Sequence, residues 1–218
     1  MKKFFLLSLA VVFCYFSLQT AEAAITAHDQ VYRQGMYDIT YPQFSGIASL
    51  SAEEKINQAM VDMASRFTVE AGLIKAAEEK APPVPGHIKK YAALMKYEMR
   101  YQSDNLLSFT VIRYIFAGGA HGSTVQQGFT YDLTTGDRLA FADLYRFDEG
   151  TRQAIDRQIK DQIDQKEISI FHPYSGVSDK PSFFINHQGQ PVVFFQQYEI
   201  GPYSIGIQEF VVHAERLQ

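Results

Sequence analysis

Few residues of this chain have the type and spacing that chemistry requires, and the first candidate is a histidine in a glycine-rich segment. Gly118, Gly119, Ala120, His121 and Gly122 directly follow an apolar, strand-like segment. Glycine adopts positive φ and lets another backbone or a ligand come close. Two interpretations stay open: a bulge or crossover between strands with the histidine bonded to a neighbouring carbonyl, or a histidine exposed on a ligand rim. The segment is not a phosphate loop, because neither a Lys-Ser/Thr pair nor a helix pattern follows it.

The second candidate is the sequence QQYEIGPYSIG near the end of the chain. Tyr198, Pro202 and Tyr203 are rigid amphipathic groups of the kind enriched at binding interfaces. The alternative is that both tyrosines complete the core, while Gly201 and Pro202 only shape the turn. Residue types alone support both interpretations equally.

Glu199 and Glu209 are the one carboxylate pair worth testing for acid–base chemistry. Glycosidases place two carboxylates about 5–10 Å apart, and pairing of the strands around Gly201 and Pro202 would bring these two side chains toward each other. Acidic residues in a hairpin are nevertheless common. An envelope hydrolase that uses Glu199 or His121 therefore stays an alternative to a binding protein.

Other catalytic classes lack their residue patterns. The six histidines are scattered without a zinc-binding spacing. No serine has the Gly-x-Ser-x-Gly frame of a nucleophile elbow, and the single cysteine, Cys14, lies in the N-terminal apolar run. We therefore expect no catalytic residue, no metal and no cofactor.

The N-terminus has the pattern of an export signal. Lys2 and Lys3 precede a mostly apolar run up to Phe16, and Ala21-Glu22-Ala23 supplies the small-x-small cleavage pattern. We expect a signal peptide over 1–23 and an exported protein, periplasmic or extracellular, over 24–218. An uncleaved anchor is the alternative; acylation at Cys14 is disfavoured because the bulky Phe13 precedes it.

Composition excludes several partners. The full chain has 218 residues and a formal charge of −4, which argues against nucleic acid. Beyond residue 23 no segment has the roughly 20 apolar residues of a membrane span. Without cysteine after the leader, stability must come from a packed core rather than from disulfides.

Hydrophobic periodicity in the first part of the chain predicts an edge strand over 37–44, containing Pro42, and then an amphipathic helix. Ser51 and Glu54 have the spacing of a capping box. The helical pattern continues to Lys80 with Gly72 as a break, and a Pro-rich loop follows at 81–86. Alternation then predicts a hairpin of strands over 95–101 and 107–116, with the side chains of Met95, Tyr97, Met99 and Tyr101 on one face.

The rest of the chain reads as further strands around a second helix, over 148–166. Strands are expected over 127–133, with Gly136 in the turn that follows, and over 183–186, 192–198 and 207–212. About seven strands and two or three helices indicate an α+β fold with antiparallel sheets. We expect one compact unit, or two interlocked halves, 37–116 and 123–213, that meet near the glycine segment.

Several motifs together resemble one known family. They occur in the order YPQFSG, KIN, GGAHG, TYDLTTGDRL, FADLY and VVFFQQYEIGPYSIG, and they span roughly Tyr37 to His213. The chain resembles the exported domain family, long labelled as of unknown function, that is found in the lysozyme-sensing anti-sigma factor RsiV. It is also similar to the non-catalytic region of PdaC-type peptidoglycan deacetylases.

The resemblance implies an extracytoplasmic α+β domain that binds lysozyme or accompanies cell-wall enzymes. By position, Gly118, Gly119, His121 and Gly122 correspond to the glycine signature of the family. Its tail signature corresponds to Tyr198, Glu199, Pro202, Tyr203 and Gly206. The chain departs from these relatives in lacking both the sigma-binding segment and a deacetylase domain. The prediction is therefore a non-enzymatic envelope protein whose ligand is a lysozyme-like muramidase or cell-wall glycan. A structural accessory domain of an envelope complex is a further alternative.

Overall fold

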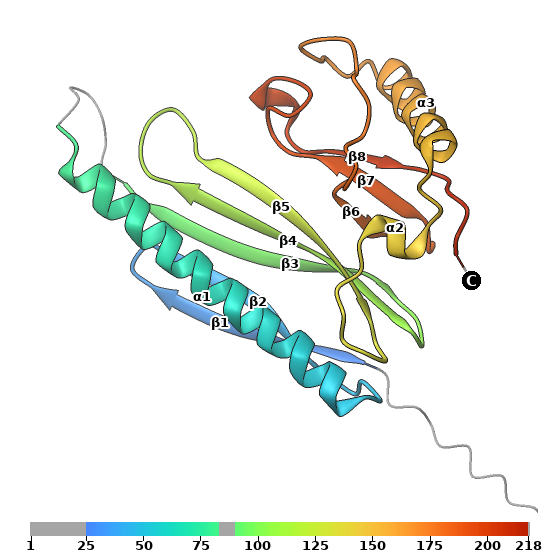
Figure 1. Ribbon diagram of the computed structural model, residues 1–218. Helices are drawn as coiled ribbons and strands as arrows, with labels where there is room; N and C mark the ends of the chain where they lie inside the picture. The colour runs from blue at the N-terminus through green and yellow to red at the C-terminus, as the bar shows by residue number, and fades with distance from the viewer. Residues whose placement is uncertain (1–24, 83–89, 218) are drawn as a thin grey trace, which may run out of the picture.

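The structure is a computed structural model, and it describes residues 25–82 and 90–217. The expected signal peptide, 1–23, and most of the Pro-rich loop lie outside these ranges. The described chain forms four layers: one long helix, a five-stranded sheet, a three-stranded sheet and a second helix (Figure 1). The α+β prediction is confirmed.

The first sheet has the strand order β1-β2-β3-β4-β5. Its strands are β1 (Thr26–Gln34), β2 (Tyr37–Ser45), β3 (Ala92–Gln102), β4 (Leu106–Phe116) and β5 (Ser123–Asp132). All neighbours are antiparallel except β2 and β3, which are parallel because the long helix crosses over between them. The predicted strand over 37–44 is confirmed as β2, but its predicted position at the sheet edge is wrong, because β1, which the sequence analysis did not predict, lies outside it. Pro42 is tolerated because the parallel pairing covers only Tyr37 to Ile39.

Helix α1 (Leu50–Lys80) is a single helix that covers one face of this sheet. Its N-cap is Ser49 rather than the predicted Ser51. The Ser49 side chain accepts a hydrogen bond from the Ala52 amide. The predicted break at Gly72 does not occur. A Cβ at Gly72 would lie 3.1 Å from the Tyr37 hydroxyl, so the glycine makes room for that phenol. The predicted apolar stripe from Ile56 to Phe67 is confirmed, and it is buried against the sheet.

A bulge in β3 changes which face two side chains occupy. The register with β4 shifts between Met99 and Tyr101, and a bulge adds one residue to a strand and bends it. Met99 packs in the α1 core, whereas Tyr101 packs in the second core. The expectation that Met95 to Tyr101 share one face therefore fails at Tyr101.

The second half of the chain builds a smaller sheet, in the order β6-β7-β8, and two helices. The strands are β6 (Phe183–Ile185), β7 (Pro191–Phe195) and β8 (Gln208–Val211); the helices are α2 (Phe141–Leu144) and α3 (Glu149–Gln165). The predicted helix over 148–166 is confirmed, with Asp148 as its N-cap and three isoleucines buried against the sheet. Every residue of β7 is buried, as an apolar strand covered on both faces requires.

The two sheets meet along a polar strip, here called the inter-sheet seam. The first sheet contributes Ser108, Gln126, Gly128 and Thr130; the second contributes Phe183 to Ile185 and Glu209. The Ile185 amide donates to the Ser108 hydroxyl over 3.0 Å, and both groups are buried. A Cβ at Gly128 would lie 1.8 Å from the Phe183 carbonyl oxygen, so only glycine allows the sheets this approach. The seam connects both halves of the chain through specific contacts rather than through apolar packing alone.

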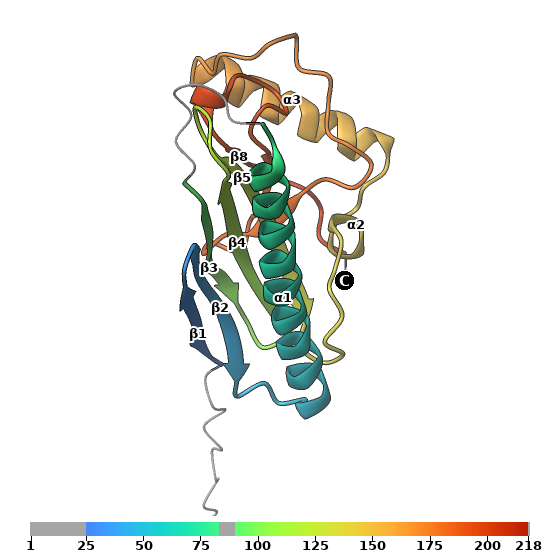
Figure 2. The same cartoon turned by 90° about the vertical axis from the view of Figure 1, so that its left-hand side faces the viewer.

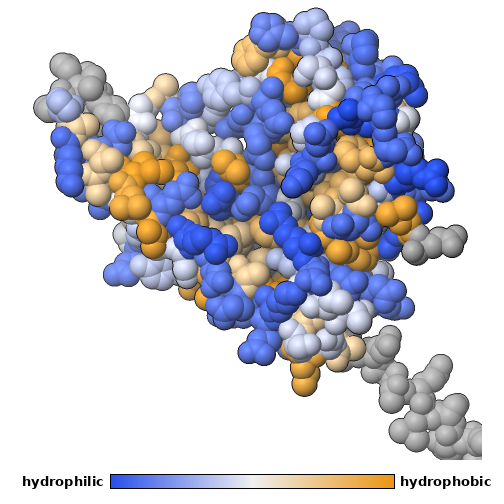
Figure 3. All heavy atoms as spheres, viewed as in Figure 1, coloured by the Kyte–Doolittle hydropathy of each residue, from blue (hydrophilic) through white to orange (hydrophobic). Residues whose placement is uncertain are grey.

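The outer surface of α1 is largely hydrophilic, with apolar side chains gathered toward its C-terminal half (Figure 3). The most exposed of these are Val69 and Leu73, at 62% and 67%. No helix among residues 25–82 and 90–217 is long and apolar enough to span a membrane.

Candidate functional site

The two segments that the sequence singled out meet at one end of the molecule. The loop between β4 and β5 carries the glycine segment, and the loop between β7 and β8 carries the short 3₁₀ helix η1 (Tyr203–Ile205). Figure 2 shows η1 beside the β4–β5 loop. Two segments about 80 residues apart in sequence thus form one surface.

Three aromatic rings define this surface, and His121, Tyr198 and Tyr203 are here called the aromatic cluster. The His121 ring stacks on Tyr203 with centroids 3.9 Å apart and planes inclined by 21°. The Tyr198 hydroxyl lies 3.2 Å from His121 Nε2, and its ring centroid lies 5.8 Å from that of Tyr203. Tyr198 is 52% exposed and His121 is also exposed. Tyr203 is half-buried, so the cluster is a set of contacting rings of which two face solvent.

The hydrogen bonds of His121 define its tautomer. His121 Nδ1 lies 3.0 Å from the Gly122 carbonyl oxygen, which can only accept, so Nδ1 carries the proton. Nε2 is then free to accept from the Tyr198 hydroxyl. Within the described residues no carboxylate hydrogen-bonds to His121, so the acidic partner that orients a catalytic histidine is missing there.

Tyr198 has a strained backbone. Its φ is +66°, in the left-handed region that non-glycine residues rarely occupy. A tight turn fixes it: the Glu199 amide donates to the Gln196 carbonyl over 3.1 Å, and the Gln196 amide donates to Glu199 Oε2 over 2.7 Å. Strain of this kind costs about 1–3 kcal/mol and concentrates at ligand-binding positions.

Glycines and a proline set the path of both loops. A Cβ at Gly122 would lie 2.4 Å from the Tyr114 ring, and one at Gly201 would lie 2.5 Å from the Ser169 carbonyl oxygen. Gly206 closes η1 with φ 69° and ψ −155°, a conformation open essentially only to glycine. Pro202 precedes η1 as its N-cap, with φ −66°. The glycines shape the loops without presenting functional groups.

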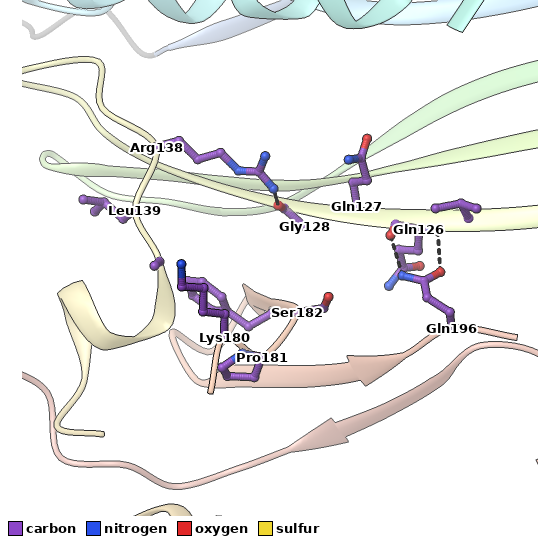
Figure 4. Close-up of a pocket in the computed structure, with 12 residues that line it drawn as sticks. Gln126, Gln127, Gly128, Arg138, Leu139, Lys180, Pro181, Ser182 and Gln196 are labelled. Carbon is purple, nitrogen blue, oxygen red and sulfur yellow. Dashed lines mark hydrogen bonds between the residues drawn. The ribbon is translucent and has the colours of Figure 1, made fainter. Parts of the chain in front are cut away.

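Sequence reasoning missed two glutamines that attach the tail loop to β5. The Gln196 carboxamide accepts from the Gln126 amide over 3.0 Å and donates to its carbonyl over 2.7 Å (Figure 4). Gln197 Oε1 accepts from the Thr124 amide over 3.1 Å. The side chains reproduce the bonds of a neighbouring strand, which protects the free edge of β5. The sequence feature that could have identified these glutamines is the polar pair that directly follows the apolar run Val192 to Phe195.

The two carboxylates considered as a catalytic pair have separate partners. Glu199 bonds to its own turn, as described above. Glu209 accepts from Gln126 Nε2 over 2.8 Å and lies 3.7 Å from an Arg100 nitrogen. Each carboxylate therefore has a structural contact of its own.

Tyr174, in the segment before β6, has a perturbed hydroxyl near this region. Burial raises the pKa of Tyr174, as do its hydrogen bond to Asp156 and the negative charges of Asp156 and Glu199. The phenol therefore keeps its proton at neutral pH and cannot serve as a base.

A cavity of about 280 Å³ opens beside the aromatic cluster, between α1 and the glycine loop. Its lining includes Phe67, Ile74, Ile115 and His121, together with the ion pair of Arg113 and Glu70 at 3.3 Å. The cavity is mostly apolar with one polar edge, a combination suited to a protruding side chain. Within 25–82 and 90–217, no three His, Cys, Asp or Glu side chains lie close enough together to hold a metal ion.

Two family profiles match this chain in succession. The profile described as "Deacetylase PdaC" matches residues 25–124, and the profile described as "Protein of unknown function (DUF3298)" matches residues 142–215. The first range holds β1 to β4 and α1; the second holds α3 and the three-stranded sheet. The resemblance drawn from the motifs is confirmed.

Individual relatives agree with the profiles. The chain is 23% identical over 189 residues to the anti-sigma-V factor RsiV of Bacillus subtilis, a match that covers 82% of this chain and 63% of that protein. A DUF3298 family structure from Bacteroides fragilis superposes with a TM-score of 0.62 at 12% identity. One from Pseudomonas aeruginosa does so with 0.58 at 15% identity. Each match covers 86% of this chain and 89% of the other. These structures share the fold.

Proposed function

We infer that this chain, which belongs to the RsiV-like and PdaC-like domain family, is an exported, non-enzymatic binding protein of the cell envelope. The observation that carries this proposal is the aromatic cluster: three contacting rings from two distant segments, of which His121 and Tyr198 are exposed and Tyr203 is half-buried beneath them. Stacked, immobilised aromatic side chains bind a partner at low entropic cost. We further propose that residues 24–218 fold as one unit, since the inter-sheet seam joins the two halves.

The polar groups around the cluster favour binding over hydrolysis. Both ring nitrogens of His121 have partners, Gly122 and Tyr198. The Glu199 carboxylate accepts a backbone hydrogen bond within its own turn. General acid–base catalysis needs a titratable group within reach of substrate and of a second catalytic group. These side chains instead fix the shape of the surface.

A lysozyme-like muramidase is the ligand we propose, with a peptidoglycan glycan as the runner-up. The family resemblance supports both ligands. The adjoining cavity favours the protein, because a mostly apolar recess beside exposed aromatic rings accepts a protruding side chain. Tyr198, Pro202, Tyr203 and His121 would contact the ligand, and Glu199 would hold the loop that presents them.

Titration of the purified protein against lysozyme and against soluble peptidoglycan fragments tests the proposal. Tyr203→Ala and His121→Ala should each weaken binding at least about tenfold, as expected for residues at the centre of an interface. Tyr32→Ala is the matched control, because Tyr32 is an exposed tyrosine on the outer strand β1. Unchanged affinity in both cluster variants, with a large loss of thermal stability, would assign the cluster to the scaffold.

Incubation with muropeptides separates binding from hydrolysis. The proposal predicts that chromatography detects no new products from the wild-type protein. Product formation that disappears in Glu199→Gln would establish the hydrolase alternative in its place.

A further inference from the structure

Strand β1 forms one edge of the first sheet, and no other described strand pairs with its outer side (Figure 2). Its nine residues, Thr26–Gln34, pair with β2 in an unbroken antiparallel register. The opposite edge strand, β5, differs, because Gln196, Gln197 and Arg138 hydrogen-bond to its backbone. An uncovered edge of this length is a template on which a further strand can pair.

Pro42, in β2, identifies the backbone groups of β1 that point outward. Opposed residues of antiparallel strands alternate between pairs that exchange hydrogen bonds and pairs whose amide and carbonyl groups point away from each other. Pro42 lies opposite Asp29 and has no amide proton, so this pair is of the second kind. Phe44 agrees, because its amide and carbonyl bond to the Asn57 side chain and not to Ala27, the residue opposite. Every second residue of β1 therefore directs its backbone groups to the open edge: Ala27, Asp29, Val31 and Arg33.

The sequence of β1 does not block such pairing. Natural edge strands are commonly protected by lysine, proline, a bulge or short length, and β1 has none of these. Val31 and Tyr32 are 48% and 40% exposed, and a further strand would cover both side chains. Asp29 and Arg33 carry opposite charges, and each lies two residues from Val31. The strand is therefore complementary to a second copy of itself that runs in the opposite direction.

We propose that β1 pairs antiparallel with β1 of a second copy of this chain, which joins the two five-stranded sheets edge to edge. With Val31 opposite its own counterpart, Asp29 of each copy lies opposite Arg33 of the other, and Tyr32 lies opposite Gln30. Opposite charges directly across a strand pair stabilise the pairing, and the open backbone groups gain hydrogen bonds. A register centred on Asp29 or on Arg33 would instead set like charges against each other.

Both charged side chains keep hydrogen-bonding capacity for the second copy. Asp29 Oδ1 accepts from the Tyr97 hydroxyl over 2.5 Å, and Arg33 Nε donates to Asp38 Oδ1 over 2.8 Å. Within 25–82 and 90–217, the other carboxylate oxygen of Asp29 and the terminal nitrogens of Arg33 have no hydrogen-bond partner. Tyr97 and Asp38 thus hold the two charges in place at the edge, which reduces the entropic cost of association.

The pairing leaves the aromatic cluster accessible and does not depend on the function proposed for it. Strand β1 lies at the opposite edge of the sheet from β5, and the loop with His121 precedes β5. An interface of standard size buries about 1,600 Å², and one strand from each copy contributes less. We therefore expect a weak dimer, with a dissociation constant of about 10–100 μM.

Charge reversal on β1 tests the pairing by sedimentation velocity of the purified protein at about 1–500 μM. The wild type should form a dimer as its concentration rises. Asp29→Arg sets arginines against each other across the pair, and Arg33→Asp sets carboxylates against each other. Each variant alone should therefore associate at least about tenfold more weakly. An equal mixture of the two variants restores opposite charges at both contacts and should associate about as tightly as the wild type.

Two further variants separate backbone pairing from overall charge. Val31→Pro removes an outward amide without changing any charge, and proline is tolerated where the amide of an edge strand faces solvent. The variant should keep its circular dichroism spectrum and melting temperature but associate at least about tenfold more weakly. Asp161→Arg makes the same charge change on the exposed surface of α3 and should leave association within about twofold.

The outcomes that overturn the proposal are distinct. A wild-type protein that stays monomeric at every concentration excludes a second copy as the occupant of the β1 edge. A dimer that withstands all three β1 variants places the interface elsewhere on the molecule. Failure of the mixed variants to associate excludes the antiparallel charge pairing, and equal weakening in Asp29→Arg and Asp161→Arg attributes the effect to overall charge.

Discussion

The inter-sheet seam and the aromatic cluster both join segments that are distant in sequence, but the seam does so through buried contacts and the cluster largely through exposed ones. At the seam, buried hydroxyls hydrogen-bond across the two sheets, and one glycine lets two backbones come into contact. At the cluster, exposed rings stack on a loop with one strained residue. Buried contacts of the first kind determine stability, whereas exposed and immobilised groups of the second kind are available to a partner. Substitutions at the two places should therefore have separable effects.

The largest effect is expected for Gly128→Ala at the seam. A methyl group would lie 1.8 Å from the Phe183 carbonyl oxygen, so one sheet must move away from the other. We expect a loss of at least about 3 kcal/mol in the free energy of unfolding, measured by urea denaturation.

Gly150→Ala provides the control for this change. Its Cβ would meet no atom closer than 3.5 Å, in the first turn of α3, where alanine is the better helix former. Stability should stay equal or rise. A loss at Gly128 no larger than at Gly150 would contradict the seam as described.

A smaller loss is expected for Ser108→Ala. The hydroxyl accepts from the Ile185 amide and lies 2.9 Å from Thr130 Oγ1, all within the buried seam. Its removal leaves a buried amide without that partner, which costs about 1–3 kcal/mol. Calorimetry should show this cost in Ser108→Ala and a change within about 0.5 kcal/mol in Ser65→Ala, on the exposed face of α1. Equal melting temperatures in the two variants would count against the seam hydrogen bond.

Tyr198→Gly should separate binding from stability at the cluster. Glycine relieves the strain at φ +66° while the exposed ring is lost. We expect stability to change by less than about 1 kcal/mol, and partner affinity to fall. In Tyr32→Gly the same side chain is lost from an extended strand, where glycine is unfavourable and destabilises by roughly 1 kcal/mol. Equal destabilisation in both variants would argue that the Tyr198 backbone is not strained.

The smallest effect is expected outside both regions, at the N-cap of α3. Hydrogen bonds from the Thr151 backbone amide and side chain lower the pKa of Asp148 below its ordinary value of 3.8. The folded state therefore binds this proton less readily than the unfolded state. The stabilisation is complete above the unfolded pKa and is lost as the pH falls through the folded pKa.

Asp148→Asn keeps a capping oxygen but removes the titration. Melting temperatures measured between pH 5 and pH 2 should fall slightly less steeply in this variant than in the wild type. A parallel decline in both proteins would show that Asp148 contributes nothing to the acid sensitivity.

Local pattern was enough to predict most elements but not how they assemble. The helical stripe from Ile56 to Phe67, the three isoleucines of α3 and the run Val192 to Phe195 are buried as their periodicity indicates. Strand β1 was missed because it lies at the sheet edge with nearly all its residues exposed, and so lacks an apolar face. The parallel pairing of β2 with β3 depends on the crossover of α1, which periodicity does not encode.

The candidate residues of the aromatic cluster were selected by type, while their juxtaposition came only from the structure. Tyrosines and glycines beside a histidine indicate two loops of interest, but nothing in the spacing predicts a stacking distance of 3.9 Å between His121 and Tyr203. The roles of Gln196 and Gly128 depend on contacts across the seam, so one chain segment alone carries no sign of them.

Hydrogen-exchange mapping of the purified protein with and without saturating lysozyme is the most direct test of the account. Binding through the aromatic cluster predicts slowed exchange in residues 117–124 and 196–206, with the inter-sheet seam equally protected in both states. Protection confined to other surfaces, such as β1 or the outer face of α3, would contradict it.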